Sequence, residues 1–219
     1  MDAPFPLESF LLDSRISRLR DIADQKTRSL TVVLDGLHDP HNISAVLRSS
    51  EGLGLLDVHV IESRASFALR PQVTRGAEKW LDLHRYDDPA ACVKELQKLD
   101  FQLWAAEPPP GGVPLSQIPW EKPIALVFGN EHLGLSAAMK QAATGFFSLT
   151  MYGFCQSFNV SVSAGIALAL AVREREARLG HHGDLSAEEK AALLCDWQKR
   201  SVRASERILA HIKRFENQP

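Results

Sequence analysis

The sequence predicts an α/β fold, a mostly parallel six-stranded sheet with helices on both faces. Short β-branched and aliphatic runs alternate with helix-spaced segments along the 219 residues. Several of these runs, such as LTVVLD at 30–35, are apolar without alternation, which is typical of strands buried on both faces of a parallel sheet. With 45% apolar and 24% charged residues, the composition is that of a globular protein with one domain plus appendages.

The predicted elements follow one another in regular order. Strands are predicted at residues 30–35, 58–62, 81–86, 101–106, 123–129 and 146–151. Helices are predicted at residues 8–28, 43–53, 89–98, 136–143, 160–178 and 187–215. The resulting domain organisation is an N-terminal helical extension (1–29), a central domain (30–178) and a C-terminal helical extension (179–219).

Residues 149–178 join a strand end, a polar turn and a long helix. The helix after Asn159 is rich in Ala, Gly and Ser and has aliphatic residues on most faces, so another backbone can approach it closely. We therefore expect it to be buried against its own sheet or against a second subunit. A polar turn on a buried helix favours a ligand site, although a capped core helix would use the same residues.

The composition limits the class of protein. No apolar run reaches the ~20 residues of a membrane span, and no basic segment precedes the apolar patch at the N-terminus, so neither a membrane span nor a signal peptide is expected. The three cysteines have neither disulfide-scaffold nor zinc spacing, which favours a reducing, cytoplasmic location. The net charge is −2, but residues 199–214 hold six Lys and Arg against one acid, which fits a solvated helix face or a phosphate-binding one.

Three polar loops follow predicted strands. The first, DPHNISAVLRSS, has Asn42 where a helix N-cap would stand, and Arg48 among apolar neighbours, suited to a salt bridge or to an anion. The second, VFGNEHLGLS, places Glu131 between two glycines at a strand end and matches neither the dinucleotide pattern nor the P-loop pattern. The third, QSFNVSV, carries Ser157 and Asn159.

Together, NxSAxxR, LVFGNExxG and QSxNVSV resemble the three motifs of the SPOUT class of methyltransferases, in particular the TrmH branch of RNA ribose 2′-O-methyltransferases. The resemblance covers about residues 30–178. The flanking helices and the HDPHN loop further resemble the branch members that methylate the D-loop guanosine of tRNA, at position 18. The resemblance implies a homodimer, a deep trefoil knot in the C-terminal part of the domain, S-adenosylmethionine as cofactor, tRNA as partner, and no metal.

The motifs also imply which residues form the site. The cofactor-binding positions would be Ala106, Gly129, Leu149 and Phe158. The catalytic positions would be Asn42, Arg48, Glu131, Ser157 and Asn159. The basic residues that we expect to contact the tRNA backbone are Arg15, Arg18, Arg20, Lys199, Arg200 and Arg203.

The role of Arg48 follows from the reaction. Methyl transfer to a ribose hydroxyl requires that the oxygen be aligned with the methyl donor and lose its proton. The family implicates this arginine in activating the hydroxyl, but a guanidinium does not accept a proton at neutral pH. We therefore expect Arg48 to stabilise the developing alkoxide and to grip the adjacent phosphate. Thr150 and Phe158 replace the Pro and Leu that the family commonly has beside the adenine pocket, which leaves the width of this pocket open.

Several alternatives share these features. The nearest is 2′-O-methylation of rRNA or of the tRNA anticodon loop by the same class of enzyme. A SPOUT-fold RNA-binding protein without turnover is disfavoured by the polar motif residues. A Rossmann dehydrogenase is disfavoured because the glycine fingerprint is missing.

Overall fold

The computed structural model describes residues 6–62 and 69–216, with side chains of the last helix described as far as residue 212. The chain divides into two compact units. One unit contains residues 27–182, and the other combines residues 1–26 with residues 183–219. Each unit has its own secondary structure, and the larger one contains the sheet.

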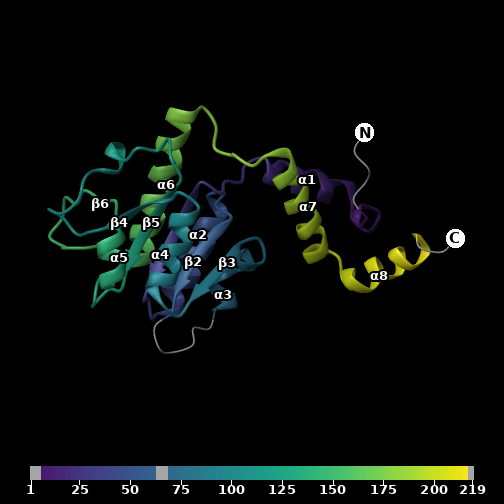
Figure 1. The fold of residues 1–219 in the computed structure, drawn as a ribbon, viewed down its shortest axis with the longest axis horizontal. Helices are drawn as coiled ribbons and strands as arrows, with labels where there is room; N and C mark the ends of the chain where they lie inside the picture. Colours follow the sequence, from purple (N-terminus) through teal and green to yellow (C-terminus); the bar gives the residue numbers. More distant parts are fainter. Residues whose placement is uncertain (1–5, 63–68, 217–219) are drawn as a thin grey trace. The chain divides into compact units, whose positions relative to one another are not determined.

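The larger unit is built on a parallel sheet with strand order β3-β2-β1-β5-β4-β6 (Figure 1). Its strands are β1 (Leu30–Asp35), β2 (Asp57–Ile61), β3 (Asp82–Tyr86), β4 (Gln102–Ala106), β5 (Ile124–Gly129) and β6 (Gly145–Phe147). All five strand pairings are parallel, which confirms the fold class that the continuous apolar runs predicted. The strand order reverses where β1 meets β5, and in open α/β sheets ligands bind beyond the carboxyl ends of the strands at such a point.

Helices cover both faces of this sheet. They are α2 (Pro40–Gly52), α3 (Pro71–Thr74), α4 (Pro89–Lys98), α5 (Ala137–Ala142) and α6 (Val160–Leu179), with 3-10 turns η2 (Ala77–Lys79) and η3 (Leu115–Gln117). One apolar cluster joins α2 and α6 to one face of the strands, and a second joins α4 and α5 to the other face. Alternate residues of β1 therefore enter different cores: Val32 belongs to the first cluster and Val33 to the second.

Two elements of the larger unit differ from the predicted boundaries by more than one residue. Helix α2 begins at Pro40, because Asp39 is the N-cap and accepts a hydrogen bond from the His41 amide (2.9 Å). Asn42 is therefore inside the first turn, and the interpretation of Asn42 as the cap is wrong. Strand β6 ends at Phe147 instead of residue 151, because the Ser148 amide leaves the β4 ladder and donates to the Val113 carbonyl (3.0 Å).

The smaller unit is helical. Its elements are η1 (Glu8–Phe10), α1 (Asp13–Ala23), α7 (Ala187–Ser201) and α8 (Ser205–Glu216). The sequence predicts one continuous C-terminal helix, but the chain turns after α7, where Val202 is extended and Ala204 adopts a φ of 61°. Within the unit, α1 packs on α7, and Lys190 forms an ion pair with Asp24 (2.8 Å).

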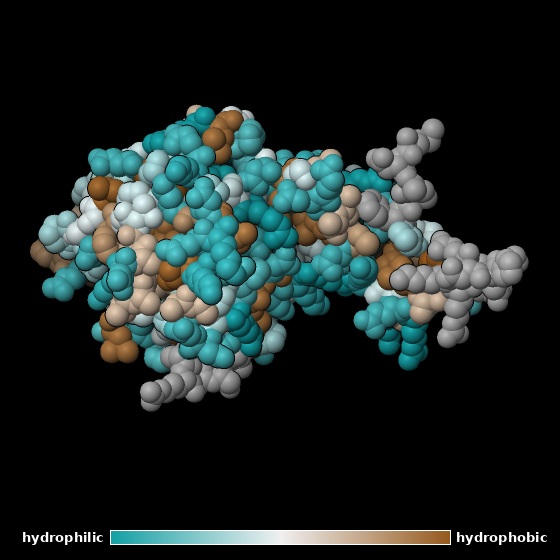
Figure 2. Space-filling model, in the orientation of Figure 1, coloured by the Kyte–Doolittle hydropathy of each residue, from teal (hydrophilic) through white to brown (hydrophobic). Residues whose placement is uncertain are grey.

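The face drawn in Figure 2 is mostly hydrophilic, and its apolar patches are small and scattered. Among the described residues, no helix is long and apolar enough to cross a membrane.

A polar network ties together the strands β2 and β3 at the edge of the sheet. Asp57 accepts two hydrogen bonds from Arg28 (2.7 and 2.9 Å) and one from His84 (2.8 Å). His59 is buried beside them, stacks on His84 at 4.6 Å between ring centroids, and has its Nδ1 3.0 Å from the Tyr86 hydroxyl. Burial, and then the charge on His84, lowers the pKa of His59 from 6.5 to about 4. His59 is therefore neutral in the folded protein at neutral pH.

We expect the free energy of unfolding to fall as the pH is lowered from 6.5 to about 4. In this range the unfolded chain binds a proton at His59, whereas the folded chain does not. The full interval corresponds to roughly 3 kcal/mol. Urea unfolding at several pH values measures it, and His59→Gln should flatten this part of the curve. The two neighbouring groups change the free energy of unfolding at other pH values. The pKa of His84 is raised, so its stabilising contribution is lost only as the pH rises above 6.5. The pKa of Asp57 is lowered, so its stabilising contribution is lost only as the pH falls below 3.8. An unchanged slope in the variant would contradict the assignment.

Candidate functional site

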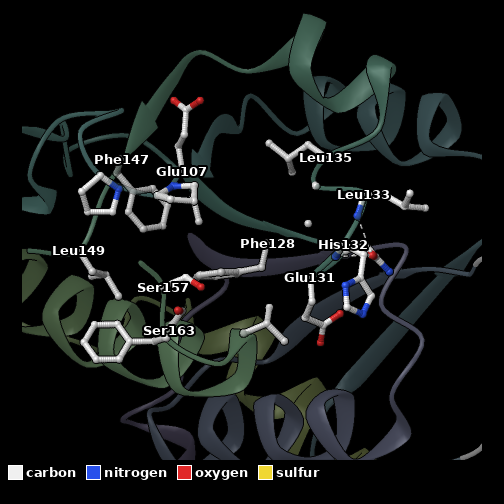
Figure 3. Close-up of a pocket in the computed structure, with 18 of the residues that line it drawn as sticks. Glu107, Phe128, Glu131, His132, Leu133, Leu135, Phe147, Leu149, Ser157 and Ser163 are labelled. Atoms are coloured by element: carbon white, nitrogen blue, oxygen red, sulfur yellow. Dashed lines mark hydrogen bonds between the residues drawn. The ribbon is translucent and has the colours of Figure 1, made fainter. Parts of the chain in front are cut away.

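A pocket of about 450 Å³ lies at the carboxyl ends of β4 and β5. Its walls come from these strand ends, from the loop that follows β5 and from the segment between β6 and α6. Figure 3 shows Phe128 in the middle of the lining, with Glu131 and His132 on one side and Leu149 and Ser157 on the other. The pocket therefore lies next to the point where the strand order reverses.

All four residues that the motifs suggest for cofactor binding line this pocket. They are Ala106, Gly129, Leu149 and Phe158. Of the two departures from the family pattern, Phe158 lies in the lining, whereas Thr150 is not among the lining residues. The structure thus brings these positions together, although the first and the last are 52 positions apart in the chain.

The loop after β5 approaches its own strand so closely that only glycine fits at its start. A Cβ on Gly129 would lie 2.6 Å from the carbonyl carbon of Gly134, shorter than any real contact. Gly134 itself has a φ of +68°, a conformation that other residues adopt at a cost. The two glycines that frame Glu131 therefore serve the tight fold of the loop, as the sequence suggested.

A chain of side-chain hydrogen bonds joins the three motif segments beside the pocket. Asn42 donates through Nδ2 to Glu131 Oε1 (2.7 Å), and Asn159 donates through Nδ2 to Asn42 Oδ1 (3.1 Å). Asn159 also caps α6, because its Oδ1 accepts from the amides of Ser161 (2.9 Å) and Val162 (3.4 Å). The orientation of the Asn42 amide is therefore set by an acceptor on one side and a donor on the other.

The other two predicted catalytic residues are placed differently. Ser157 lines the pocket. Arg48 is solvent exposed on α2 and is not among the lining residues. Within the described part of the chain it forms no hydrogen bond or ion pair. The structure of a single chain thus joins Asn42, Glu131 and Asn159 and leaves the guanidinium of Arg48 to solvent.

The pocket lining also includes polar and ionisable side chains that the sequence analysis did not identify. Glu107, His132 and Lys140 line it. Glu107 directly follows Ala106, so the position at the end of β4 was a signal that could have identified it. Lys140 lies on α5, and no sequence motif identifies it as a site residue.

The six basic residues proposed for RNA all lie in the smaller, helical unit. Arg18, Lys199 and Arg203 are exposed. Arg20 is paired with Glu8 (2.7 Å), Arg200 is paired with Asp196, and Arg15 is half-buried. The first three have charge available for a phosphate, whereas Arg20 and Arg200 are also exposed but would have to exchange partners.

The described residues contain no group of three or more His, Cys, Asp or Glu side chains placed to hold a metal ion. Cys155, in the loop before α6, is exposed, and Cys92 is buried, where burial raises its thiol pKa to about 12. Cys92 is therefore a core side chain in its protonated form.

The fold and the site define an α/β protein whose pocket lies at the carboxyl ends of a parallel sheet, with three motif segments joined by hydrogen bonds at its edge. Residues 29–169 match the model of the SpoU rRNA methylase family. The chain belongs to this family.

Known relatives resemble the chain over nearly its whole length. It is 32% identical over 198 residues, 90% of each chain, to a tRNA (guanosine(18)-2′-O)-methyltransferase of Borreliella burgdorferi. It is 31% identical, over 90% of this chain and 94% of the other, to a protein of the same name from Aquifex aeolicus. The crystal structure of the A. aeolicus TrmH/SpoU tRNA modifying enzyme superposes with a TM-score of 0.78 at 29% identity and covers 87% of this chain and 98% of that one.

Asn159 both caps α6 and donates a hydrogen bond to Asn42, so we expect two substitutions at this position to have different effects. Asn159→Ala should lower the free energy of unfolding by about 1 kcal/mol, because α6 loses its cap. Asn159→Asp keeps an acceptor for the helix amides and should retain most of this stability, while it loses the hydrogen bond to Asn42. Chemical denaturation of both variants measures the difference. Equal loss in the two variants would show that the cap does not stabilise α6.

Proposed function

We propose that this protein transfers a methyl group from S-adenosylmethionine to the ribose 2′-hydroxyl of the D-loop guanosine, position 18, of tRNA. The observation that carries the proposal is the hydrogen-bonded chain of Glu131, Asn42 and Asn159 at the edge of a pocket lined by all four cofactor positions. The relatives named for this reaction support the choice of substrate. Their matches extend over 198 residues, beyond the 29–169 family region, and so include flanking segments that would select the RNA.

The residues of the pocket fit this cofactor. Its volume, about 450 Å³, is in the range that small-molecule sites have. Phe128 and Leu149 offer apolar walls for an adenine, and Glu107 and Lys140 bring charges of both signs for the amino and carboxylate groups of the methionine portion. Ala106 and Gly129 line the pocket without a bulky side chain that would fill it. The bound cofactor supplies the methyl group, activated by its sulfonium leaving group.

The chain itself has to align the ribose oxygen and accommodate its loss of a proton. Asn42, held by Glu131 and Asn159, presents a fixed amide next to the pocket, and Ser157 forms part of the same wall. Arg48 is exposed and has no partner among the described residues, so its guanidinium is available for the phosphate beside the target ribose and for the developing alkoxide. The proton passes to water, because a guanidinium cannot take it at neutral pH.

The proposal includes the assembly that the resemblance implies. An exposed aliphatic row on α6, formed by Val162, Ile166 and Leu170, supports a homodimer in which this face is covered. Contacts of the loop between β4 and β5 with both β6 and the end of α6, such as Arg178 to the Ser116 carbonyl (2.6 Å), support a knotted path for the C-terminal segment of the domain. Residues 1–29 and 179–219 would be RNA-docking extensions of the methyltransferase domain at 30–178. We place the enzyme in the cytoplasm.

We expect the purified protein to methylate one nucleotide of unmodified tRNA when it is given labelled S-adenosylmethionine, and mass spectrometry of nuclease digests should place the methyl group on the ribose of guanosine 18. A tRNA that carries 2′-O-methylguanosine at that position is the matched control and should accept no label. Label in rRNA or in the tRNA anticodon loop would support the alternative substrates. Cofactor binding without transfer to any RNA would support a non-catalytic protein.

We expect Arg48→Ala to lower turnover by about 100-fold or more, which is the usual effect of removing one donor to a developing oxyanion. Binding of S-adenosylmethionine, measured by calorimetry, should not change, because Arg48 is not in the pocket lining. Arg85→Ala is a suitable control, since Arg85 pairs with Glu62 on the β3 side of the sheet. A rate near that of the wild type would exclude Arg48 from the reaction.

We expect the combined variant Lys199→Gln, Arg200→Gln and Arg203→Gln to bind tRNA more weakly and with less dependence on salt. If all three contact phosphates, the slope of log affinity against log salt should become shallower by roughly two to three. The pair Lys94→Gln and Lys98→Gln on α4 removes exposed basic charge from the other unit and serves as the control. An unchanged slope in the triple variant would show that these basic residues form a solvated surface and do not contact tRNA.

A further inference from the structure

The end of β1 holds the loop that carries Glu131. Asn130 is buried, with 7% of its surface exposed, and all its hydrogen bonds are inside the protein. Its Nδ2 donates to the Gly36 carbonyl (2.8 Å), directly after β1. Its Oδ1 accepts from the amides of His132 (2.8 Å) and Leu133 (3.0 Å), the two residues that follow Glu131. One side chain thus connects the end of the neighbouring strand to the loop backbone that follows Glu131.

If the hydrogen bond from Asn130 to Gly36 is lost, the loop cannot easily rearrange within itself to compensate. The amide of Asn130 donates to the Gly134 carbonyl (3.0 Å), and the amide of Gly134 donates back to the Asn130 carbonyl (2.9 Å), so the five residues form a closed turn. We expect this turn to keep its own shape, because these two hydrogen bonds close it on itself. Its direction relative to the sheet therefore depends on the bond from Asn130 to Gly36.

A second residue of β1 holds the far end of the loop. Asp35 is 3% exposed, and its Oδ2 accepts from the Ser136 amide (2.7 Å), at the start of α5. Burial raises the pKa of Asp35, and the hydrogen bonds from Ser136 oppose that rise. In the strand register Asp35 lies beside Gly129. The last residue of β1 and the one after it thus hold both ends of the segment from 129 to 136.

Glu131 depends on this support because its own side chain is exposed. A hydrogen bond between two exposed side chains gains little unless the backbone already places them, since each side chain loses rotamer freedom. Glu131 nevertheless lies 2.7 Å from Asn42 Nδ2. The backbone of the loop must therefore bring its carboxylate to the right place.

We propose that Asn130 and Asp35 are positioning residues: they orient the loop so that Glu131 holds Asn42. Asn130 also borders the pocket, but both ends of its side-chain amide are used for contacts inside the protein. The expected effect on catalysis rests on the proposed function, whereas the structural link from Asn130 to Asn42 does not. The two parts are measured separately.

The link itself is measured by NMR of the full-length protein, through the side-chain amide of Asn42. Glu131→Ala defines the signal of an Asn42 that has lost its acceptor. Asn130→Asp keeps both acceptor contacts to the loop amides but replaces the donor to the Gly36 carbonyl by an oxygen, and it should move the Asn42 signal to the same place. A folded Asn130→Asp protein with the wild-type Asn42 signal would overturn the proposal.

The Asp35 anchor is tested by a pair of variants. Asp35→Ala removes the acceptor for the Ser136 amide and should shift the Asn42 signal, whereas Asp35→Asn keeps a carbonyl acceptor and should restore most of it. Thr31→Val is the matched control, because it removes another buried hydrogen bond of the same strand, from Thr31 to the Asp57 carbonyl (2.6 Å), at the opposite end. It should leave the signal unchanged. If Thr31→Val shifts the signal as far as Asp35→Ala, general loss of stability explains the effect and the proposal is wrong.

The catalytic part is measured by a double-mutant cycle. Asn130→Asp and Glu131→Ala should each lower kcat by about 100-fold, the scale expected for a misplaced catalytic group, and the double variant should be no slower than Glu131→Ala alone. Additive losses would mean that Asn130 does not act through Glu131. If the wild-type protein methylates no RNA, the proposed function fails, and the Asn42 signals still decide the positioning link.

Discussion

The parallel pairing of β1 with β5 is the constraint on which the rest of the site depends. Its register places Asp35 beside Gly129, so the loops that leave the two strands begin next to each other. One loop leads into α2 and brings Asn42, and the other forms the closed turn that carries Glu131. The strand order reverses here, and the pocket lies next to this point, at the carboxyl ends of β4 and β5.

The polar residues of the site also stabilise local structure. Asn159 caps α6 with one atom of its amide and bonds Asn42 with the other. Asn130 connects the β5 loop to β1 in the same way. Because each amide group has two ends with different chemistry, one residue can hold the backbone and still orient a neighbour. Stability and reactivity are therefore linked at these positions, and only substitutions that preserve one end of the amide separate them.

The opposite end of the sheet contributes to folding stability. There Arg28, Asp57 and His84 pair across β2 and β3, away from the carboxyl ends of the strands. The pH dependence that we expect from His59 is a property of this network and concerns folding. The methyl transfer would depend on groups at the other end of the strands. The pH dependence of stability and that of turnover are therefore expected to have separate origins.

The sequence by itself determined the elements and the residue types of the site. The apolar run at β1 identified a doubly covered strand, and the glycines around Glu131 indicated a tight loop, because both follow from local chemistry. Only the tertiary structure decided that Asp39, not Asn42, caps α2, and that Asn42 is held instead by residues 89 and 117 positions away. It also left Arg48 outside the pocket of the single chain. Such contacts depend on which strands become neighbours, and strand order is set by packing of the whole sheet, which local sequence does not encode.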